Sequence, residues 1–172
     1  GVGSTFWLTA RVHAVAQAVV PGAWQPRVDP EAIAARHAGR RLLLVEDDEI
    51  NQEVACELLV DTGLQVEVAS NGREAVDLVR RGEVDVMVMD LSMPEHGGVD
   101  ALAAIRARAP DLPVLILSGF PETHYATTLL RQGASGYLNK ECDPEEIVRA
   151  IRTVYRGRRY ITAPVAELLA DS

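Results

Sequence analysis

The sequence predicts an α/β fold in which a parallel sheet is covered by helices on both faces. Short apolar runs alternate five times with helical patterns after residue 40, and this alternation is typical of a doubly wound sheet. Runs such as LLLV and VLIL are continuously apolar, as expected for strands buried on both sides. The 172 residues are enough for one such domain with extensions.

Five strands and five helices are predicted in alternation. The strands are expected at residues 42–45, 64–69, 84–89, 114–117 and 135–138, and the helices at 49–61, 72–81, 98–108, 122–132 and 143–156. The run LQVEVA alternates between apolar and polar residues, which predicts that the second strand lies at an edge of the sheet. The segment APVAELLADS predicts a short helix after the fifth.

Polar residues mark the starts of two of these helices. Asn71 precedes the second helix and Glu74 lies three residues later, which predicts a capping box. Asp143 precedes the fifth helix, Pro144 fits its first position, and Glu146 completes the same pattern.

Composition and charge exclude several classes of protein. A net charge of -8 argues against a surface built to bind nucleic acid. No apolar run approaches the roughly 18 residues of a membrane span. The two cysteines lack metal-ligand spacing, which favours a reducing, cytoplasmic location. Because the chain begins GVGST without an initiator methionine, we expect a fragment of a longer protein.

The first 40 residues differ from the remainder in charge and composition. Four arginines stand against two acidic residues, so this stretch carries +2 of the total charge of -8, and the remainder carries -10. Three prolines and an alanine-rich end predict a linker over residues 13–40, with a short helix at 30–38.

Charged and hydroxyl side chains stand at the ends of the predicted strands. Glu46 and Asp47 end the first strand and Asp90 ends the third, whereas Ser118 and Lys140 end the fourth and fifth. The carboxyl ends of the strands of a doubly wound sheet share one edge, where ligands bind. We therefore expect three carboxylates, one hydroxyl and one ammonium to converge.

The convergence of three carboxylates indicates a cation site. Any one of them alone would be read as a solvated loop residue, but three close together repel one another. Mg²⁺ suits a site with few carboxylates and several waters, and Mg²⁺ beside a lysine, a serine and an aspartate is typical of phosphoryl transfer.

Lys140 is the only lysine in the chain, since all 16 other basic residues are arginines. An ammonium is a compact point charge that contacts a phosphoryl oxygen and a carboxylate at once, whereas a guanidinium is a wide planar fork. The alternative is that the position of the single lysine is a matter of chance. The position at a strand end favours a functional role.

Four motifs surround these residues: LLLVEDDE, VMVMDLSMP followed by GG, LILSG and GYLNK. In this order and spacing they resemble the receiver domain of a two-component response regulator, over residues 41–157. The resemblance implies a flavodoxin-like (βα)5 fold with five parallel strands in the order 2-1-3-4-5. It implies that Asp90 is the phosphoacceptor, and that Glu46, Asp47, Asp90 and the main-chain carbonyl of Ser92 hold Mg²⁺.

The same resemblance assigns four further positions. Ser118 and Lys140 would bind the phosphoryl oxygens, and Gly119 would leave room for them. Ser118 and Tyr137 would form the conformational switch. Pro commonly follows the family's lysine, but Glu141 stands there in this sequence, so we expect no cis peptide bond.

The implied function is Mg²⁺-dependent transfer of a phosphoryl group to Asp90 from a histidine kinase or a histidine phosphotransfer protein. Phosphorylation would switch the surface around the fifth strand and the last two helices, and a homodimer through the last helices is a further expectation. The domain would assist its own phosphorylation and dephosphorylation without being an enzyme. This fragment would contact neither nucleic acid nor membrane.

The resemblance leaves the parent protein open. INQEVACELL and VEVASNGREAV resemble the receivers of hybrid histidine kinases, whereas the stretch from GASGYLNK to RRYIT resembles receivers that precede a helix-turn-helix domain. GVGSTFWLTARV resembles the closing strand of a kinase ATP-binding domain. We expect a kinase remnant at 1–12, a linker at 13–40, the receiver at 41–157 and a tail at 158–172.

Two alternatives remain beside the favoured hybrid-kinase parent. One is the receiver part of a DNA-binding transcription regulator. The other is an aspartate-based phosphatase, which is disfavoured because Ser92 stands where that chemistry needs a second aspartate.

Overall fold

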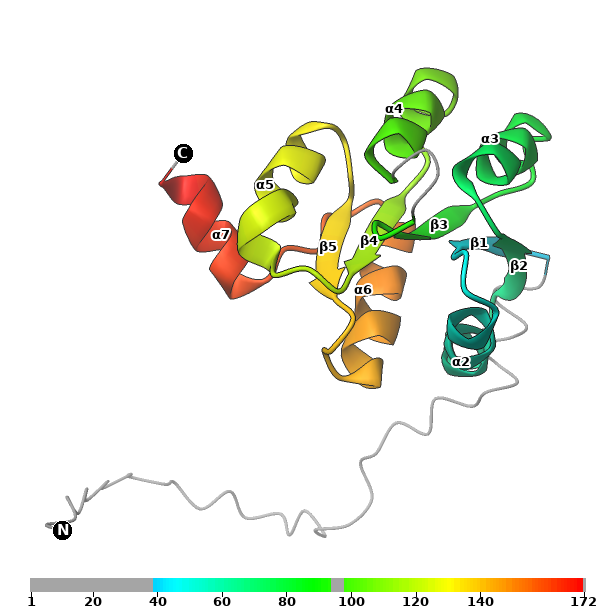
Figure 1. Ribbon diagram of the computed structural model, residues 1–172, viewed down its shortest axis with the longest axis horizontal. Coiled ribbons are helices and arrows are strands. Elements are labelled where there is room, and N and C mark those ends of the chain that lie inside the picture. Colours follow the sequence, from blue (N-terminus) through cyan, green and yellow to red (C-terminus); the bar gives the residue numbers. More distant parts are fainter. Residues whose placement is uncertain (1–38, 94–97, 172) are drawn as a thin grey trace, which may run out of the picture.

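A single parallel sheet organises the computed structural model, which describes residues 39–93 and 98–171 (Figure 1). The sheet has the strand order β2-β1-β3-β4-β5. Its strands are β1 (Arg41–Val45), β2 (Gln65–Ala69), β3 (Val86–Asp90), β4 (Val114–Ser118) and β5 (Gly136–Asn139). The helices are α2 (Glu49–Leu59), α3 (Gly72–Arg80), α4 (Gly98–Arg108), α5 (Glu122–Arg131), α6 (Pro144–Tyr155) and α7 (Ala163–Ala170), with a short 3₁₀ helix, η1 (Val60–Thr62). The predicted fold class and strand order are confirmed, and β2 lies at an edge as its alternation predicts.

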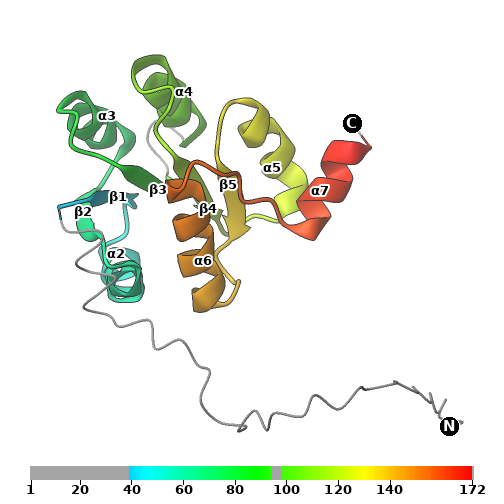
Figure 2. The same cartoon turned by 180° about the vertical axis from the view of Figure 1, so that it is seen from behind.

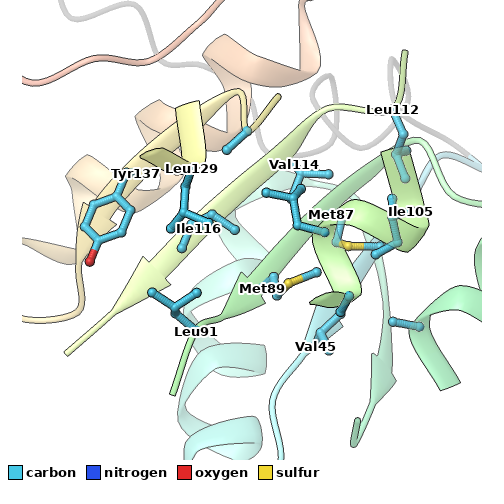
Figure 3. Close-up of a cluster of buried hydrophobic side chains, with 14 of the residues drawn as sticks. Val45, Met87, Met89, Leu91, Ile105, Leu112, Val114, Ile116, Leu129 and Tyr137 are labelled. Atoms are coloured by element: carbon cyan, nitrogen blue, oxygen red, sulfur yellow. The ribbon is translucent and has the colours of Figure 1, made fainter. Parts of the chain in front are cut away.

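Helices cover both faces of the sheet. α3, α4 and α5 lie on one face, and α2 and α6 lie on the other (Figures 1 and 2). Each face has its own hydrophobic cluster, because alternate residues of a strand point to opposite sides. Met87, Ile116 and Tyr137 belong to the cluster under α3, α4 and α5 (Figure 3), and Val88 and Ile151 belong to the one under α2 and α6. Burial on both faces explains the continuously apolar strands.

The element boundaries differ from the predicted ones by only one or two residues. β3 begins at Val86, two residues later than predicted, and continues through Asp90. The carboxylate of Asp85, just before the strand, accepts from the Arg41 backbone N–H at 2.8 Å. The first helix also ends earlier than predicted. α2 gives way to η1, and Gly63 then turns the chain with a φ of 74°, a conformation that favours glycine.

The two predicted capping boxes have different outcomes. At α3, the Asn71 side chain accepts from the Glu74 N–H at 2.9 Å, as predicted, while the Glu74 carboxylate accepts from the Ser70 N–H. At α6, Asp143 and Pro144 do begin the helix, but the Asp143 side chain makes no capping hydrogen bond, so that prediction was wrong. The Glu146 carboxylate instead accepts from the Tyr160 hydroxyl at 3.1 Å, which draws it away from the helix start.

The segment after α6 returns to the sheet. The Tyr160 N–H donates to the Ser135 carbonyl at 2.9 Å, and Tyr160 pairs in parallel with Gly136 of β5. A Cβ on Gly136 would lie 2.9 Å from the Tyr160 carbonyl oxygen, so this close approach requires glycine. The predicted terminal helix, α7, then packs beside α5, and its Val165 joins the cluster that contains Tyr137 (Figures 1 and 2).

Several predictions fall on residues outside the described ranges. The kinase remnant at 1–12 and all but the end of the linker at 13–40, including the helix at 30–38, stay predictions for that reason. Among the helices of residues 39–93 and 98–171, none is long and apolar enough to cross a membrane. No disulfide joins Cys56 and Cys142, and the same ranges contain no cis peptide bond.

Candidate functional site

Three carboxylates meet at the carboxyl edge of the sheet. β1 and β3 are neighbours in register, with Val45 beside Met89, so the residues that follow them share one end. Glu46, Asp47 and Asp90 each place a carboxylate oxygen within 4.8 Å of the others. Glu46 and Asp90 are each only 4% exposed, whereas Asp47 faces solvent. The predicted convergence of these three residues is present in the structure.

The Lys140 ammonium joins two of these carboxylates. Its Nζ lies 2.8 Å from Glu46 Oε2 and 3.0 Å from Asp90 Oδ2. Burial would lower the Lys140 pKa, but the hydrogen bonds to Glu46 and Asp90 and the charges of both carboxylates together raise it above its ordinary value. Lys140 is therefore charged at neutral pH, and it offsets part of the repulsion between the carboxylates.

Glu46 is held by the first turn of α2, a contribution that sequence reasoning missed. The Gln52 side-chain amide donates to the Glu46 carbonyl at 2.7 Å, and the amide of Asn51 lies 3.5 Å from Glu46 Oε1. The Asp48 N–H also donates to Glu46 Oε1, at 3.3 Å, while the Asp48 carboxylate caps α2. The amides at positions 51 and 52, directly after the acidic strand end, are the signal that could have identified them.

Asp90 is fixed by its own loop. Its Oδ1 accepts from the Ser92 N–H at 3.0 Å, and its Oδ2 faces Lys140. Gly98 at the start of α4 approaches this strand end closely, since a Cβ there would lie 3.1 Å from the Asp90 carbonyl oxygen. The second glycine of the GG pair thus allows α4 to begin directly against the end of β3.

Ser118 lies at the end of β4, fully buried, but its hydroxyl is turned along its own loop. Ser118 Oγ accepts from the Phe120 N–H at 3.1 Å. The Ser118 carbonyl accepts from the Lys140 N–H at 2.9 Å, which ties the ends of β4 and β5 together. Among the described residues, no hydrogen bond joins the Ser118 hydroxyl to Asp90 or to the Lys140 ammonium. The structure brings Ser118 to the predicted edge without direct side-chain contact with the charged cluster.

Tyr137 connects this loop to the core. Its ring is 1% exposed and packs in the cluster under α5 (Figure 3), and its hydroxyl donates to the Phe120 carbonyl at 3.2 Å. Phe120 therefore receives one hydrogen bond from Tyr137 and donates another to Ser118. A movement of the Ser118 hydroxyl would release the N–H of Phe120, the residue whose carbonyl accepts from Tyr137.

The donor set suits a hard divalent cation. Carboxylate oxygens from three residues lie within the spacing that one ion spans, and hard cations prefer oxygen ligands. Asp47 is exposed, and the ion pairs of Lys140 in the described residues are with Glu46 and Asp90. The negative charge of Asp47 is therefore not offset by a direct contact with the ammonium. The residues present therefore fit Mg²⁺.

Comparison with known proteins identifies the family. The family described as "Response regulator receiver domain" matches residues 42–152. The chain belongs to this family. A receiver domain accepts a phosphoryl group and binds Mg²⁺ at an acidic pocket, so the predicted phosphoacceptor function and flavodoxin-like fold are confirmed at the level of the domain.

Similar proteins come from several bacteria. "Response regulator UvrY" from Escherichia coli strain K12 is 38% identical over 133 residues, which cover 76% of this chain and 61% of the relative. "Transcriptional regulatory protein DegU" from Brevibacillus brevis is 34% identical over 132 residues, covering 75% and 56%. The crystal structure of a LuxR-family two-component response regulator from Aurantimonas sp. SI85-9A1 matches with a TM-score of 0.70 and 34% identity, covering 76% of this chain and 95% of that one.

The relatives bear on whether this receiver resembles those of hybrid histidine kinases or those that precede a helix-turn-helix domain. The chain spans only about three fifths of the length of the curated relatives that it matches. These relatives are named response regulators or transcriptional regulators, in agreement with the second half of the sequence-based resemblance. The hybrid-kinase parent and the bounds of the four predicted segments stay predictions.

Proposed function

We propose that Asp90 is the residue that accepts the phosphoryl group. The observation that carries the assignment is that its buried carboxylate lies 3.0 Å from the Lys140 ammonium and within 4.8 Å of the carboxylates of Glu46 and Asp47. Asp47 is exposed, and Glu46 is held at its carbonyl and its carboxylate by the first turn of α2, whereas Asp90 is buried at the end of β3, the middle strand of the sheet. The donor would be a phosphohistidine on a histidine kinase or a histidine phosphotransfer protein, in the cytoplasm as the sequence predicts.

The residues of this chain have separate roles in the transfer. An Asp90 carboxylate oxygen forms a bond to phosphorus while the bond from phosphorus to the histidine nitrogen breaks, and that electron pair stays on the imidazole. The Ser92 N–H holds Asp90 Oδ1, which fixes the orientation of the nucleophile. Glu46, Asp47, Asp90 and the Ser92 carbonyl would hold Mg²⁺, which when bound neutralises phosphoryl oxygens.

Lys140 and Ser118 would report the new group to the rest of the receiver. The ammonium would exchange its bond to Asp90 for one to a phosphoryl oxygen while keeping its bond to Glu46. The Ser118 hydroxyl would leave the Phe120 N–H and turn toward the same group. Because Tyr137 is bonded to the Phe120 carbonyl, the change would reach β5 and the core under α5.

The acceptor is tested with a small phosphodonor, phosphoramidate, and Mg²⁺. Intact mass spectrometry should show one acid-labile phosphoryl group on the wild-type chain and none on Asp90→Asn. Asp100→Asn, an exposed aspartate on α4, is the matched control and should label like the wild type. Equal labelling of Asp90→Asn and wild type would remove Asp90 from the proposal.

A second candidate is the receiver part of a transcription regulator. The similarity to DegU and to a LuxR-family structure favours it over the hybrid kinase as the parent protein. Reading the full-length gene decides between them. A helix-turn-helix segment after this receiver would establish the regulator, and a kinase domain before it would establish the hybrid kinase.

A further inference from the structure

A groove runs between α2 and α6 on one face of the sheet. It consists of two hollows of about 310 Å³ and about 560 Å³, and Leu58 of α2 and Pro144 of α6 line both. The two helices lie next to each other on this face in Figures 1 and 2. Because α2 packs against β2, whereas α6 packs against β3, β4 and β5, the groove lies beneath β1, the strand between β2 and β3.

The described chain begins at one end of this groove. β1 starts at Arg41, and all strands of this parallel sheet start at the same edge. The second hollow reaches that edge, because it is lined by Asp61 of η1 and by Arg156 directly after α6, where both helices have run back from the carboxyl ends of the strands. Gly39 turns the chain before β1 with a φ of 81°. The residues before Gly39 therefore leave the receiver at this end of the groove.

The α6 side of the groove is basic. Arg149, Arg152 and Arg156 follow at intervals of three and four residues, which places them on one side of the helix, and all three line the second hollow. Arg149 and Arg156 are exposed, while Arg152 donates to the Asp61 carbonyl at 2.8 Å. Among the described residues, the ion pairs involve none of these three arginines. We call the three arginines the basic rim.

The α2 side of the groove is apolar. Val54 lines the first hollow although 61% of its surface is exposed, and the half-buried Leu58 lines both hollows. Ile50, one turn before Val54, is 73% exposed. Burial of apolar surface contributes about 25 cal/mol per Å², so covering these side chains would be favourable. A well-matched occupant of the groove therefore combines apolar side chains with carboxylates.

The sequence shortly before Gly39 contains both kinds of side chain. We call residues 24–33, which read WQPRVDPEAI, the docking segment. Its large apolar residues are Trp24, Val28 and Ile33. Asp29 and Glu31 are the only acidic residues among the first 40, and both lie in this segment, which has a single arginine and so a net charge of -1. Its charge is opposite in sign to that of the basic rim.

The length of chain between this segment and the receiver suits a contact within one molecule. Glu31 precedes Gly39 by eight residues, which span about 12 Å as a helix and at most about 28 Å when extended. The 12 residues of α6 make a helix about 18 Å long, so the basic rim lies within reach. Because the segment is joined to the receiver, its local concentration at the groove is on the order of millimolar, and a weak contact is enough.

We propose that the docking segment binds in the groove between α2 and α6 of its own molecule. The segment follows the groove from the edge where β1 begins, and its two carboxylates lie against the basic rim. Trp24 and Val28, which are further from β1 in sequence, cover Val54 and Leu58. The contact joins the receiver to the chain that precedes it, and it extends toward the site, since Lys140 lines the first hollow.

Tryptophan fluorescence of the full chain tests this contact. With Trp7→Phe, Trp24 is the only tryptophan, and in this parent chain it should emit at a shorter wavelength than a solvated indole and resist quenching by acrylamide. Arg149→Glu with Arg156→Glu places like charges opposite one another. It should shift the equilibrium toward the undocked segment about tenfold and raise the quenching of Trp24 about twofold. Circular dichroism establishes that the variant is folded.

Changes in the docking segment itself provide the decisive comparison. Asp29→Arg with Glu31→Arg should raise the quenching of Trp24 to a similar extent, and it leaves every residue of the receiver unchanged, so a folding defect of the receiver cannot explain the result. When these changes are combined with the reversed basic rim, opposite charges face each other again. The combined variant should return to the quenching of the parent chain.

The control reverses two exposed arginines on the opposite face of the sheet. Arg73→Glu with Arg108→Glu, on α3 and α4, should leave the quenching of Trp24 unchanged. A solvated Trp24 in the parent chain overturns the proposal, as does quenching that reversal of the basic rim leaves unaltered. A combined variant that stays undocked also overturns it. Protection that is lost over an about hundredfold dilution overturns it as well, because the segment would then bind another copy of the chain.

Discussion

The Lys140 ammonium and the Glu46 carboxylate lie 2.8 Å apart although 94 residues separate them in sequence. This ion pair joins the end of β1 to the end of β5, across β3 and β4, and Asp90 at the end of β3 accepts from the same ammonium. One lysine thus contacts both the proposed acceptor and a proposed metal ligand. Its shape, as well as its charge, is therefore expected to matter.

Lys140→Arg should separate phosphorylation from its conformational response. The charge is retained, so the acceptor should still be modified, but the planar guanidinium does not place one donor between Glu46 and Asp90 in the same way. In two-dimensional amide NMR spectra, beryllofluoride should shift Ser118 and Tyr137 strongly in wild type and weakly in the variant. Arg108→Lys on α4 is the reverse change at an exposed position and should respond like wild type. Full shifts in Lys140→Arg would show that any cation suffices.

Asp47→Ala should stabilise the metal-free receiver and remove its response to Mg²⁺. Without the ion, the exposed Asp47 adds repulsion to Glu46 and Asp90; with it, Asp47 is a ligand. Since the ion binds the folded state, wild type should gain about 2.7 kcal/mol at a hundred times the dissociation constant. Thermal unfolding with and without Mg²⁺ measures both effects. Glu167→Ala on α7 removes one exposed charge elsewhere and should keep the wild-type response; a wild type insensitive to millimolar Mg²⁺ would contradict the metal assignment.

Gly136→Ala should destabilise the receiver by about 1–3 kcal/mol, because a methyl group there overlaps the Tyr160 carbonyl and the Leu115 side chain, each 2.9 Å away. Urea unfolding gives the difference in free energy. Gly119→Ala is the matched control, since no atom lies within 4 Å of its added methyl group, and its effect should stay within about 0.5 kcal/mol. Equal stability of the two variants would mean that the approach of Tyr160 to β5 is not tight in solution.

Tyr137→Phe should cost about 0.5–1.5 kcal/mol, the usual net contribution of one intramolecular hydrogen bond, because the ring stays while the donor to the Phe120 carbonyl is lost. Chemical denaturation measures the loss of stability. The same variant should also shorten the reach of beryllofluoride-induced NMR shifts from Ser118 into β5. Unchanged propagation of those shifts would place the route from Ser118 to the core elsewhere than at the Tyr137 hydroxyl.

Most of the fold was predictable because each strand and helix is marked by the hydrophobic pattern of its own residues, and because strand and helix patterns alternate along the chain. The continuous apolar runs located the buried strands, and the alternating run located the edge strand, each within two residues. The capping box at Asp143 could not be excluded in this way, since Glu146 is diverted by Tyr160, a residue that is distant from the helix start in sequence. The hydrogen bond from Tyr160 to the Glu146 carboxylate is visible only once the segment after α6 is placed against that helix.

The part of the site that could be predicted is the set of residues that stand directly at the carboxyl ends of the strands. Glu46, Asp47, Asp90 and Lys140 meet because parallel strands place their carboxyl ends together. The orientation of the side chains was not predictable from this argument: Ser118 reaches the same edge but turns its hydroxyl to Phe120. The amides of Asn51 and Gln52 are visible in the sequence directly after the acidic strand end, but their contacts with Glu46 depend on how α2 leaves β1.

The pairing of Tyr160 with the beginning of β5 has a consequence for the solution behaviour of shortened chains. β5 is the last strand of the sheet, and its outer side would otherwise offer free backbone N–H and C=O groups. Such groups are a template on which other chains can add strands and aggregate. A chain cut after residue 157 would lose both Tyr160 and α7. Because Val165 of α7 belongs to the hydrophobic cluster that contains Tyr137, the cut would also expose part of that cluster. The segment that contains Tyr160 and α7 thus covers backbone groups and apolar surface on which other chains could otherwise assemble.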